Sequence, residues 1–406
     1  MAEPEYPTRL GLEEALEIVV RHGAQHRLPA ETIELDNARG RVSADDVRAP
    51  HPLPPFDNSA MDGFALRAED LPAEGERAFE VIGDVFAGAT SAPKVGTGQC
   101  VRITTGAPMP AGADTVVIKE NVTVDGARAR VKAGEKAGAN VRKAGEDYAA
   151  GDLAIAAGTP LGAAQLAVLA ALGVAGIPAR RMPRIAVIAT GNELAAAGRP
   201  LGFGQIHESN AVMLAALARD SGAQVVAQKH IRDDPEALRV ALLDAATDAD
   251  LIVTSGGVSA GEADHLPDVL QAIGEIHFHK VRLKPGMPTL FGQVGACLVF
   301  GLPGNPVASA VTFRVFVGFA LRAMLGIAAV SPPRRARLDS PVHKLHARAE
   351  LARCSLRTDA DGVLWATPHA KQGSGMLRGL AETDALALLP EGARNFAAGD
   401  VVTLWP

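Results

Sequence analysis

The spacing of hydrophobic residues divides the chain into stretches of different character. Near the amino end, Leu12, Leu16 and Val19 recur at helical spacing and predict an amphipathic helix over 12–22. Residues 60–147 instead hold short apolar runs separated by Gly, Pro and Asp turns. That pattern is typical of an all-β unit, either a sandwich or a barrel.

From residue 183 to about residue 326 the pattern alternates between strand and helix. The buried runs RIAVIAT, ADLIVTS and ACLVFG alternate with helical segments such as NAVMLAALARDSG. Such alternation predicts a doubly wound parallel sheet with helices on both faces. The proline- and arginine-rich stretch 331–335 is typical of a linker, and short strands return after it. We therefore predict a small β domain at the carboxyl end.

Composition and charge narrow the class of protein. Of 406 residues, 48% are hydrophobic and 21% are charged, which is typical of a globular chain. A net charge of −6 and an aromatic content of 4% argue against nucleic-acid binding and against attraction to anionic lipid. The three cysteines lie far apart, which argues against a disulfide framework or a thiolate metal site.

The chain shows no pattern that favours a membrane protein. Its amino end, MAEPEYPTRLGLEEA, is acidic and lacks the apolar core of a signal peptide. Two apolar stretches, 161–177 and 307–325, are interrupted by glycine or arginine and are interpreted as buried helices rather than spans. We expect a cytoplasmic protein.

Acidic residues follow three predicted strands of the α/β region. They are Glu193, Asp233 and Asp264. Ligands bind at the carboxyl ends of strands in open α/β sheets, and carboxylate oxygens suit Mg²⁺ together with phosphate and water. Each residue singly could instead cap a helix. For all three together we favour a metal site.

Two glycine-bearing loops lie at strand ends in the same region. One holds Ser255, Gly256 and Gly257, and the other holds Gly304 and Asn305 before a predicted helix. Backbone amides and a helix amino end favour phosphate at such loops. Neither loop is a GxGxxG or Walker A motif, so a dinucleotide or P-loop site gains little support. Ordinary tight turns remain the alternative.

One predicted strand carries three cations at alternate positions. Lys280, Arg282 and Lys284 would share a face, which favours an anionic ligand, although a solvated edge is the alternative. Polar loops also occur around residues 55–64, 104–108 and 140–147, and each taken singly is more typical of a turn. No HExxH or GxSxG motif supports a zinc hydrolase or a nucleophilic serine.

Several longer motifs occur in a characteristic order. They are PFDNSAMDGFA, RITTGAPMPAGADTVV, GEDYAAGD, IATGNEL, IRDDPEAL, TSGGVSAGEADH, LKPGMP and GLPGNPV. In these motifs the chain resembles the molybdopterin molybdenumtransferases, the molybdenum insertases of molybdenum cofactor synthesis, to which the C-terminal domain of gephyrin is also similar. The resemblance covers nearly the whole chain, and PFDNSAMDG, SGGVSAGEAD and LPGNPV are its most specific parts.

The resemblance implies a reaction and an architecture. Molybdenum from molybdate would be inserted into adenylated molybdopterin, and AMP would be released in the presence of Mg²⁺. The subunit would have four domains and form an elongated homodimer in which both chains contribute to each cleft. The implied fold is multidomain α/β plus all-β, with a central doubly wound α/β domain and a small C-terminal β-barrel domain. The expected domains are an elongated discontinuous one (1–50 with 146–182), an inserted β-rich one (51–145), the α/β molybdopterin-binding one (183–328) and the C-terminal barrel (329–406).

Roles for individual residues also follow from the resemblance. The implied catalytic residues are Asp62, Lys280 and Lys284, the two lysines lying near molybdate. The implied metal residues are Glu193, Asp233 and Asp264. The implied substrate-binding residues are Thr105, Arg142, Asp147, Ser255, Gly256, Gly257, Gly304, Asn305, Arg353 and Ser374. Of all these, Asp62, Thr105, Arg142 and Asp147 would face the cleft from the partner subunit, and Arg353 and Ser374 would add to the anion site.

The chain departs from the family pattern at three positions. Met287 replaces a common lysine, Ala308 replaces a common serine, and Arg378 follows the Gln-Gly-Ser segment where small hydroxyl residues are usual. We hypothesise that Arg378 compensates for the missing lysine. Two alternative functions stay open: an enzyme similar to molybdopterin adenylyltransferase, and a non-catalytic binding scaffold similar to gephyrin. A molybdopterin adenylyltransferase is also a candidate partner.

Overall fold

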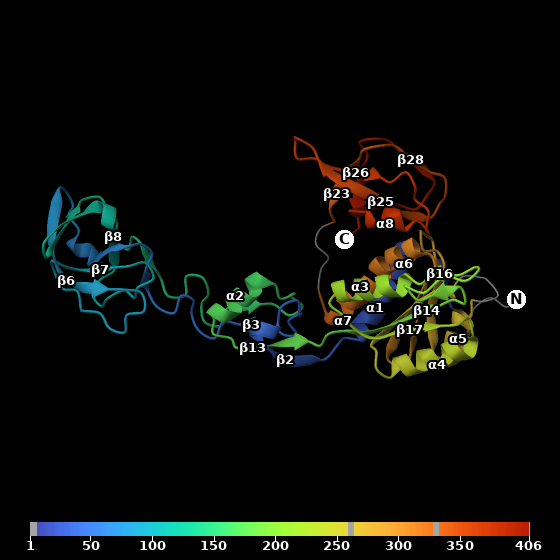
Figure 1. The fold of residues 1–406 in the computed structure, drawn as a ribbon. Coiled ribbons are helices and arrows are strands. Elements are labelled where there is room, and N and C mark those ends of the chain that lie inside the picture. Colours follow the sequence, from blue (N-terminus) through green and yellow to red (C-terminus); the bar gives the residue numbers. More distant parts are fainter. Residues whose placement is uncertain (1–5, 259–263, 328–332, 406) are drawn as a thin grey trace.

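The protein is long and consists of units strung along one axis (Figure 1). The computed structural model describes residues 6–258, 264–327 and 333–405. A β-rich unit lies at one end, a narrow middle segment follows, and an α/β domain with a barrel stacked on it forms the other end (Figure 1). The predicted boundary between residues 328 and 329 lies outside the described residues.

The α/β domain is built on a seven-stranded sheet of order β1-β19-β21-β22-β18-β14-β17. Its strands are β1 (Thr8–Leu10), β14 (Arg184–Thr190), β17 (Gln224–Ile231), β18 (Leu251–Ser255), β19 (Glu275–Val281), β21 (Leu290–Val294) and β22 (Cys297–Leu302). Strands β17, β14, β18 and β22 run parallel, whereas β21 is antiparallel to both its neighbours. The wholly parallel sheet that we predicted is therefore mixed, because a turn as short as Gly295-Ala296 joins only antiparallel strands.

Helices cover both faces of this sheet, which confirms the doubly wound prediction. On one face lie α1 (Leu12–Gln25), α3 (Asn210–Asp220), α6 (Pro306–Thr312), the π-helical turn η4 (Phe313–Val317) and α7 (Gly318–Leu325); on the other lie α4 (Pro235–Ala246) and α5 (Leu266–Ile273). Alternate residues of β14 enter the two cores: Ile185 and Val187 face the first, and Ala186 and Ile188 the second. The run 306–325 is long and apolar enough to cross a membrane, but 72% of its most apolar window is buried inside the protein.

The amino-terminal segment belongs to the α/β domain, which corrects the expected domain of 1–50 with 146–182. Strand β1 pairs in parallel with β19, and α1 packs along α7. Gly23 permits this close contact, because a Cβ there would lie 2.9 Å from the carbonyl oxygen of Ala320. The apolar stripe of α1 places Ala15 and Val19 in the core of the α/β domain.

Two separate stretches of chain make up the middle segment. Strand β2 (Ala30–Glu34) pairs with β13 (Gly176–Arg180), and β3 (Val47–Arg48) pairs with β12 (Leu153–Ile155), all antiparallel. Helix α2 (Ala163–Ala171) and the 3-10 turn η1 (Leu35–Asn37) complete it. The middle segment therefore combines residues that precede the inserted unit with residues that follow it.

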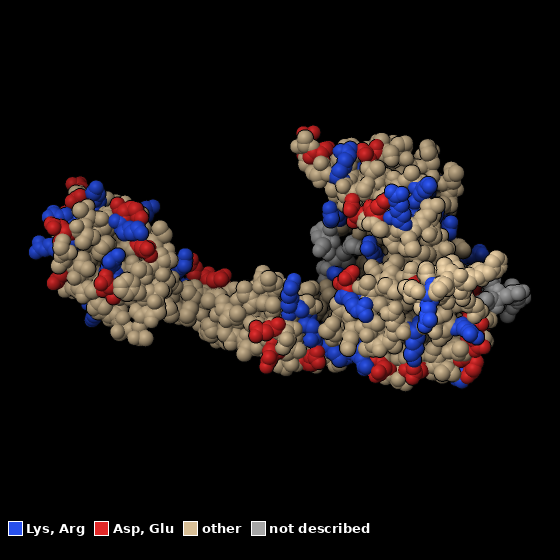
Figure 2. Space-filling view, viewed as in Figure 1, with Lys and Arg blue, Asp and Glu red and all other residues tan. Residues whose placement is uncertain are grey.

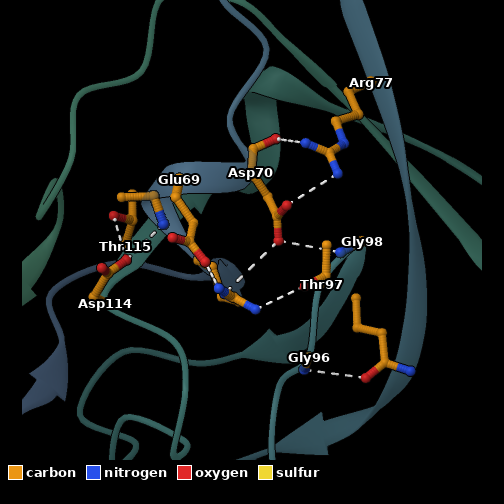
Figure 3. Close-up of polar contacts among 11 residues, drawn as sticks. Glu69, Asp70, Arg77, Gly96, Thr97, Gly98, Asp114 and Thr115 are labelled. Atoms are coloured by element: carbon orange, nitrogen blue, oxygen red, sulfur yellow. Dashed lines mark hydrogen bonds and ion pairs between the residues drawn. The ribbon is translucent and has the colours of Figure 1, made fainter.

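The inserted unit is a six-stranded sheet of order β8-β5-β7-β6-β10-β9. Its strands are β5 (Gly63–Leu66), β6 (Glu76–Val85), β7 (Gln99–Ile103), β8 (Thr115–Ile118), β9 (Val122–Asp125) and β10 (Arg128–Lys132), with 3-10 turns η2 (Ala68–Asp70) and η3 (Lys119–Asn121). Strands β4 (Asn58–Ser59) and β11 (Val141–Arg142) pair where the chain enters and leaves. Asp70 anchors its loops by accepting from Arg77 and from the amide of Gly98 (Figure 3).

The carboxyl-terminal domain is a closed five-stranded barrel, as predicted. Its strands are β23 (Arg335–Leu338), β25 (Ala349–Thr358), β26 (Leu364–Pro368), β27 (Ala385–Leu389) and β29 (Val401–Leu404), and the β25–β27 pairing closes it. Strand β20 (Leu283–Lys284) of the α/β region adds to β25, so the two domains share hydrogen bonds. Strands β24 (Val342–Lys344) and β28 (Arg394–Phe396) and helix α8 (Leu377–Ala381) lie around the barrel.

Charged side chains of both signs are interspersed over the face drawn in Figure 2. This agrees with the small net charge of −6. On that face the described residues form no large single-sign field of the kind that steers nucleic acid.

Candidate functional site

A pocket of about 220 Å³ lies at the carboxyl ends of the central strands. The ends of β14, β17 and β18 and the amino end of α6 surround it, as expected for an open α/β sheet. Short strands β15 (Leu194–Ala195) and β16 (Ile206–His207) form one wall. Its lining residues are Thr190, Gly191, Glu193, Leu194, Ile206, His207, Glu208, Ser209, Asn210, Asp233, Ser255, Gly256, Gly257, Asp264, Gly304 and Pro306.

The three acidic residues predicted for a metal all line this pocket. Asp233 accepts a hydrogen bond from the amide of Asn192 at 3.0 Å, which ties the ends of β17 and β14 together. Among the residues that the structure describes, no three His, Cys, Asp or Glu side chains stand close enough to hold a metal by themselves. A cation here would therefore need ligands from substrate or water as well.

Among the residues that the structure describes, two buried oxygen atoms beside the acidic residues have no hydrogen-bond partner. They are Thr190 Oγ1 and Asn210 Oδ1. An unpartnered buried oxygen is costly unless a ligand completes it. Hydroxyl, amide and carboxylate oxygens together form the hard donor set that Mg²⁺ prefers, so the residues present fit that ion.

Asn210 is a site residue that the sequence analysis missed. Its Nδ2 donates to Ser255 Oγ at 2.7 Å and to the carbonyl oxygen of Gly304 at 2.6 Å. It thereby joins the two glycine-bearing loops at the pocket. Its position at the start of a predicted helix resembled an ordinary helix start, so sequence alone offered no signal for this role.

Glycine is required where β18 leaves the sheet. Gly256 has a φ of +94°, and a Cβ there would lie 2.7 Å from Thr190 Oγ1 and 2.9 Å from the Thr190 carbonyl oxygen. Gly257 follows with a φ of +73°. The Gly256 Cα lies 3.7 Å from where a Cβ on Gly304 would stand, so the two predicted loops meet.

The amino end of α6 meets a loop of the barrel. Asn305 precedes the helix, and the amide of Val307 donates to the carbonyl oxygen of Ser374 at 3.0 Å. Ser309 Oγ lies 3.5 Å from Ser255 Oγ, whereas Ala308 is buried and its side chain has no polar atom. Ser309, one position later than the serine of the family pattern, thus contacts the loop that carries Ser255.

Arg353 holds the loop that carries Ser374. The side chain is 1% exposed and donates to the carbonyl oxygens of Lys371, Gly373 and Met376. Burial lowers the pKa of this guanidinium. The structure therefore gives Arg353 a supporting contact, and its direct contact with an anion stays a prediction.

The three cations predicted on one strand face do not share a face. Strand β19 ends at Val281, and Lys280 has a φ of +70°, which breaks the two-residue alternation. Arg282 Nε donates a hydrogen bond to Glu391 Oε2 at 3.0 Å. Lys284 belongs to the separate strand β20 at the barrel, where its Nζ lies 3.1 Å from Glu350 Oε1.

The residues predicted in the inserted unit lie far from this pocket within one chain (Figure 1). Asp62 accepts from the amide and hydroxyl of Thr105 at 2.9 and 3.0 Å, and these bonds lower the pKa of its carboxyl. Asp62 lines a second pocket, of about 500 Å³, with Arg102 and Lys119.

Arg142 and Asp147 line a further pocket, of about 520 Å³, near the junction with the middle segment. One chain therefore does not bring these side chains to the α/β pocket. Arg378, our candidate to replace a lysine at Met287, pairs with Glu382 at 2.9 Å, and its side chain is 90% exposed. Its role toward an anion stays a prediction.

Comparison with known families and relatives accounts for most of the chain. Residues 10–173 match the MoeA N-terminal region (domain I and II), residues 186–323 match a probable molybdopterin binding domain, and residues 335–406 match the MoeA C-terminal region (domain IV). Molybdopterin molybdenumtransferase 2 of Mycobacterium tuberculosis is 39% identical over 92% of this chain and 94% of its own length. Molybdopterin molybdenumtransferase of Haemophilus influenzae is 33% identical over 93% of each chain.

Solved structures of the same kind share the whole fold. A molybdopterin biosynthesis moeA protein from Pyrococcus horikoshii OT3 superposes with a TM-score of 0.83 and 28% identity, covering 98% of this chain and 100% of that chain. A second structure from Pyrococcus has a TM-score of 0.81 and 32% identity over 98% and 99% of the two chains. The order of elements, from the inserted β unit to the barrel, is therefore common to these proteins.

Proposed function

The chain belongs to the molybdopterin molybdenumtransferase family, and we propose that it moves molybdenum from molybdate to adenylated molybdopterin with release of AMP. Its place in molybdenum cofactor biosynthesis, by molybdenum insertion, follows from that membership. The proposal adds the two substrates and the leaving group. Water would cleave the phosphoanhydride bond, which leaves AMP and the pterin phosphate as products.

The pocket at the strand ends is the observation that carries the proposal. Gly256, Gly257 and Gly304 line it, and glycine lets a phosphate group approach the backbone closely there. Glu193, Asp233 and Asp264 would hold Mg²⁺ together with substrate oxygens. When bound, that ion would neutralise charge on the phosphates. The protein's own part is to bind and orient the nucleotide end beside the acidic residues.

A homodimer would explain the distance between the two groups of site residues. Asp62 and Arg142 line pockets on the inserted unit, away from the α/β pocket of their own chain. A second copy would bring its inserted unit to that pocket, as the family resemblance implies. We further propose a cytoplasmic location and a molybdopterin adenylyltransferase as the partner that supplies the substrate.

The test is AMP release by the purified protein from adenylated molybdopterin, with and without molybdate. We expect release to require molybdate and Mg²⁺. Asp233→Asn should raise the Mg²⁺ concentration for half-maximal rate about tenfold, because an amide attracts the cation less than a carboxylate does. Asp234→Asn is the matched control: Asp234 caps α4, and Asn caps a helix equally well.

Measurements of ATP consumption and of pterin binding by the same protein separate the alternative functions. Consumption of ATP without molybdate would indicate an adenylyltransferase activity. Binding of the adenylated pterin without AMP release, by a folded dimer, would indicate a scaffold. Equal Mg²⁺ dependence of the Asp233→Asn and Asp234→Asn proteins would contradict the metal role of Asp233.

A further inference from the structure

A buried carboxylate, that of Glu350, lies where the barrel meets the α/β domain. Glu350 is 7% exposed and stands directly opposite Lys284 in the β20–β25 pairing. Its Oε1 lies 3.1 Å from Lys284 Nζ, and its Oε2 lies 3.0 Å from His346 Nε2. Both oxygens therefore have a partner, and the carboxylate is fixed from two sides.

Most charged groups around Glu350 are cations, and Glu391 is a second carboxylate that acts on Lys344. Lys344, 2% exposed, donates to the carbonyl oxygens of His346 and Gly392, and the charges of Arg348 and Lys284 act on His346. Burial lowers the pKa of both Lys344 and His346, and Glu350 acts in the opposite direction on each. Glu350 thus stabilises a group of cations that would otherwise repel one another.

Lys284 gains a defined position from this contact. A lysine side chain has a long flexible stem, and immobilising it at a binding event is entropically costly. The ammonium has three N–H donors, and one contact with Glu350 leaves two for another anion. His346 and the β25 backbone fix Glu350, so the barrel domain holds a side chain of the α/β domain.

We propose that Glu350 is a positioning residue that orders Lys284 for the molybdate oxyanion. This inference rests on the proposed function and on the role that the family resemblance implies for Lys284, that of a lysine near molybdate. The Glu350 carboxylate also repels the oxyanion. The neighbouring cations partly neutralise the charge of Glu350 and thereby reduce this repulsion. Positioning therefore outweighs repulsion, and loss of the carboxylate weakens molybdate binding.

The first experiment measures steady-state AMP release by the full-length protein carrying Glu350→Gln. We expect the KM for molybdate to rise about tenfold, while kcat and the KM for adenylated molybdopterin stay within about twofold. Glu350→Asp keeps the negative charge on a shorter side chain, so its KM for molybdate should lie between those of wild type and Glu350→Gln. Glu391→Gln is the matched control, because Glu391 pairs with Arg282 in the same region and lacks a contact with Lys284 among the described ion pairs.

A second measurement does not depend on the reaction. Labelling with isotope-coded acetic anhydride, read by mass spectrometry, reports how freely the Lys284 amine reacts. Glu350→Gln should raise labelling of Lys284 several-fold relative to that of Lys119, whereas Glu391→Gln should leave the ratio unchanged. A wild-type protein without molybdate-dependent AMP release would contradict the proposed function alone, and labelling would then decide whether Glu350 orders Lys284.

Three results would overturn the positioning role. They are an unchanged KM for molybdate in the Glu350→Gln protein, a lower KM, and labelling of Lys284 that does not respond to the substitution. A lower KM would mean that Glu350 competes with the oxyanion for Lys284. If Glu350→Gln does not fold, the same comparison between Glu350→Asp and wild type decides, because the smaller change preserves the charge of the cluster.

Discussion

Replacing Gly256 by alanine tests whether the turn after β18 shapes the pocket. Its φ of +94° lies in the region that side chains disfavour, which costs about 1–2 kcal/mol. The added Cβ would also stand 2.9 Å from the carbonyl oxygen of Thr190, and overpacking of this kind costs about 1–3 kcal/mol. Because Thr190 pairs with Ile231 of β17 and the preceding Ala189 pairs with Ser255 of β18, the Thr190 backbone does not retreat, and the loop moves instead.

The expected result is a selective loss of nucleotide binding. A total cost of about 2–5 kcal/mol, if it falls wholly on the bound conformation of the loop, weakens AMP binding by a factor of about 30 or more. Isothermal titration calorimetry with AMP and Mg²⁺ measures this directly.

Gly198→Ala is the matched control for backbone strain. Gly198 has a φ of +81° but no neighbour within 4 Å of an added Cβ. The Gly198→Ala protein should bind AMP within about twofold of wild type, since the substitution adds backbone strain without a steric contact. If Gly256→Ala bound AMP as well as Gly198→Ala does, the steric argument for this turn would be wrong.

Two further predictions concern stability. Asp70→Ala leaves Arg77 and the Gly98 amide without their buried acceptor (Figure 3) and should destabilise the inserted unit by about 2–3 kcal/mol, less than a fully buried pair because Arg77 is 39% exposed. Hydrogen exchange of the Gly98 amide measures this, and protection equal to that of Asp70→Asn would refute it. His22 and His277 stack with centroids 3.7 Å apart, and burial lowers the pKa of both, that of His22 to about 4. The unfolded chain then binds more protons, so stability should fall as pH drops from 6.5 toward 4; His22→Phe should flatten that slope in urea unfolding, and an unchanged slope would contradict it.

Much of the fold could be predicted because its signals are local. The strand–helix alternation of 183–326 and the turn-rich texture of 60–147 reflect burial patterns that short segments carry by themselves. The mixed sheet and the docking of α1 could not be predicted in the same way. Both depend on which strand edge and helix face are left uncovered after distant segments pack.

The candidate site also contains residues that the sequence predicted and residues that it did not. Glu193, Asp233 and Asp264 were found from their positions after predicted strands, since parallel strands end at one edge of a sheet. Asn210 and Glu350 were not found, because each acts through partners far away in the sequence. The continuous cationic strand was wrong, since the left-handed conformation of Lys280 is a property of the folded loop.

By itself, the sequence determined the class of each domain and the family, and it predicted the kind of chemistry at the strand ends. The period of hydrophobic residues, the turn residues and the order of motifs are local or nearly local properties, so they can be recognised from the sequence alone. Only the tertiary structure decided that residues 8–25 join the α/β sheet, that Lys284 is held by the barrel, and that Asp62 lies far from the pocket of its own chain. Those facts depend on contacts between segments tens to hundreds of residues apart, whose free energy is set by the packed whole.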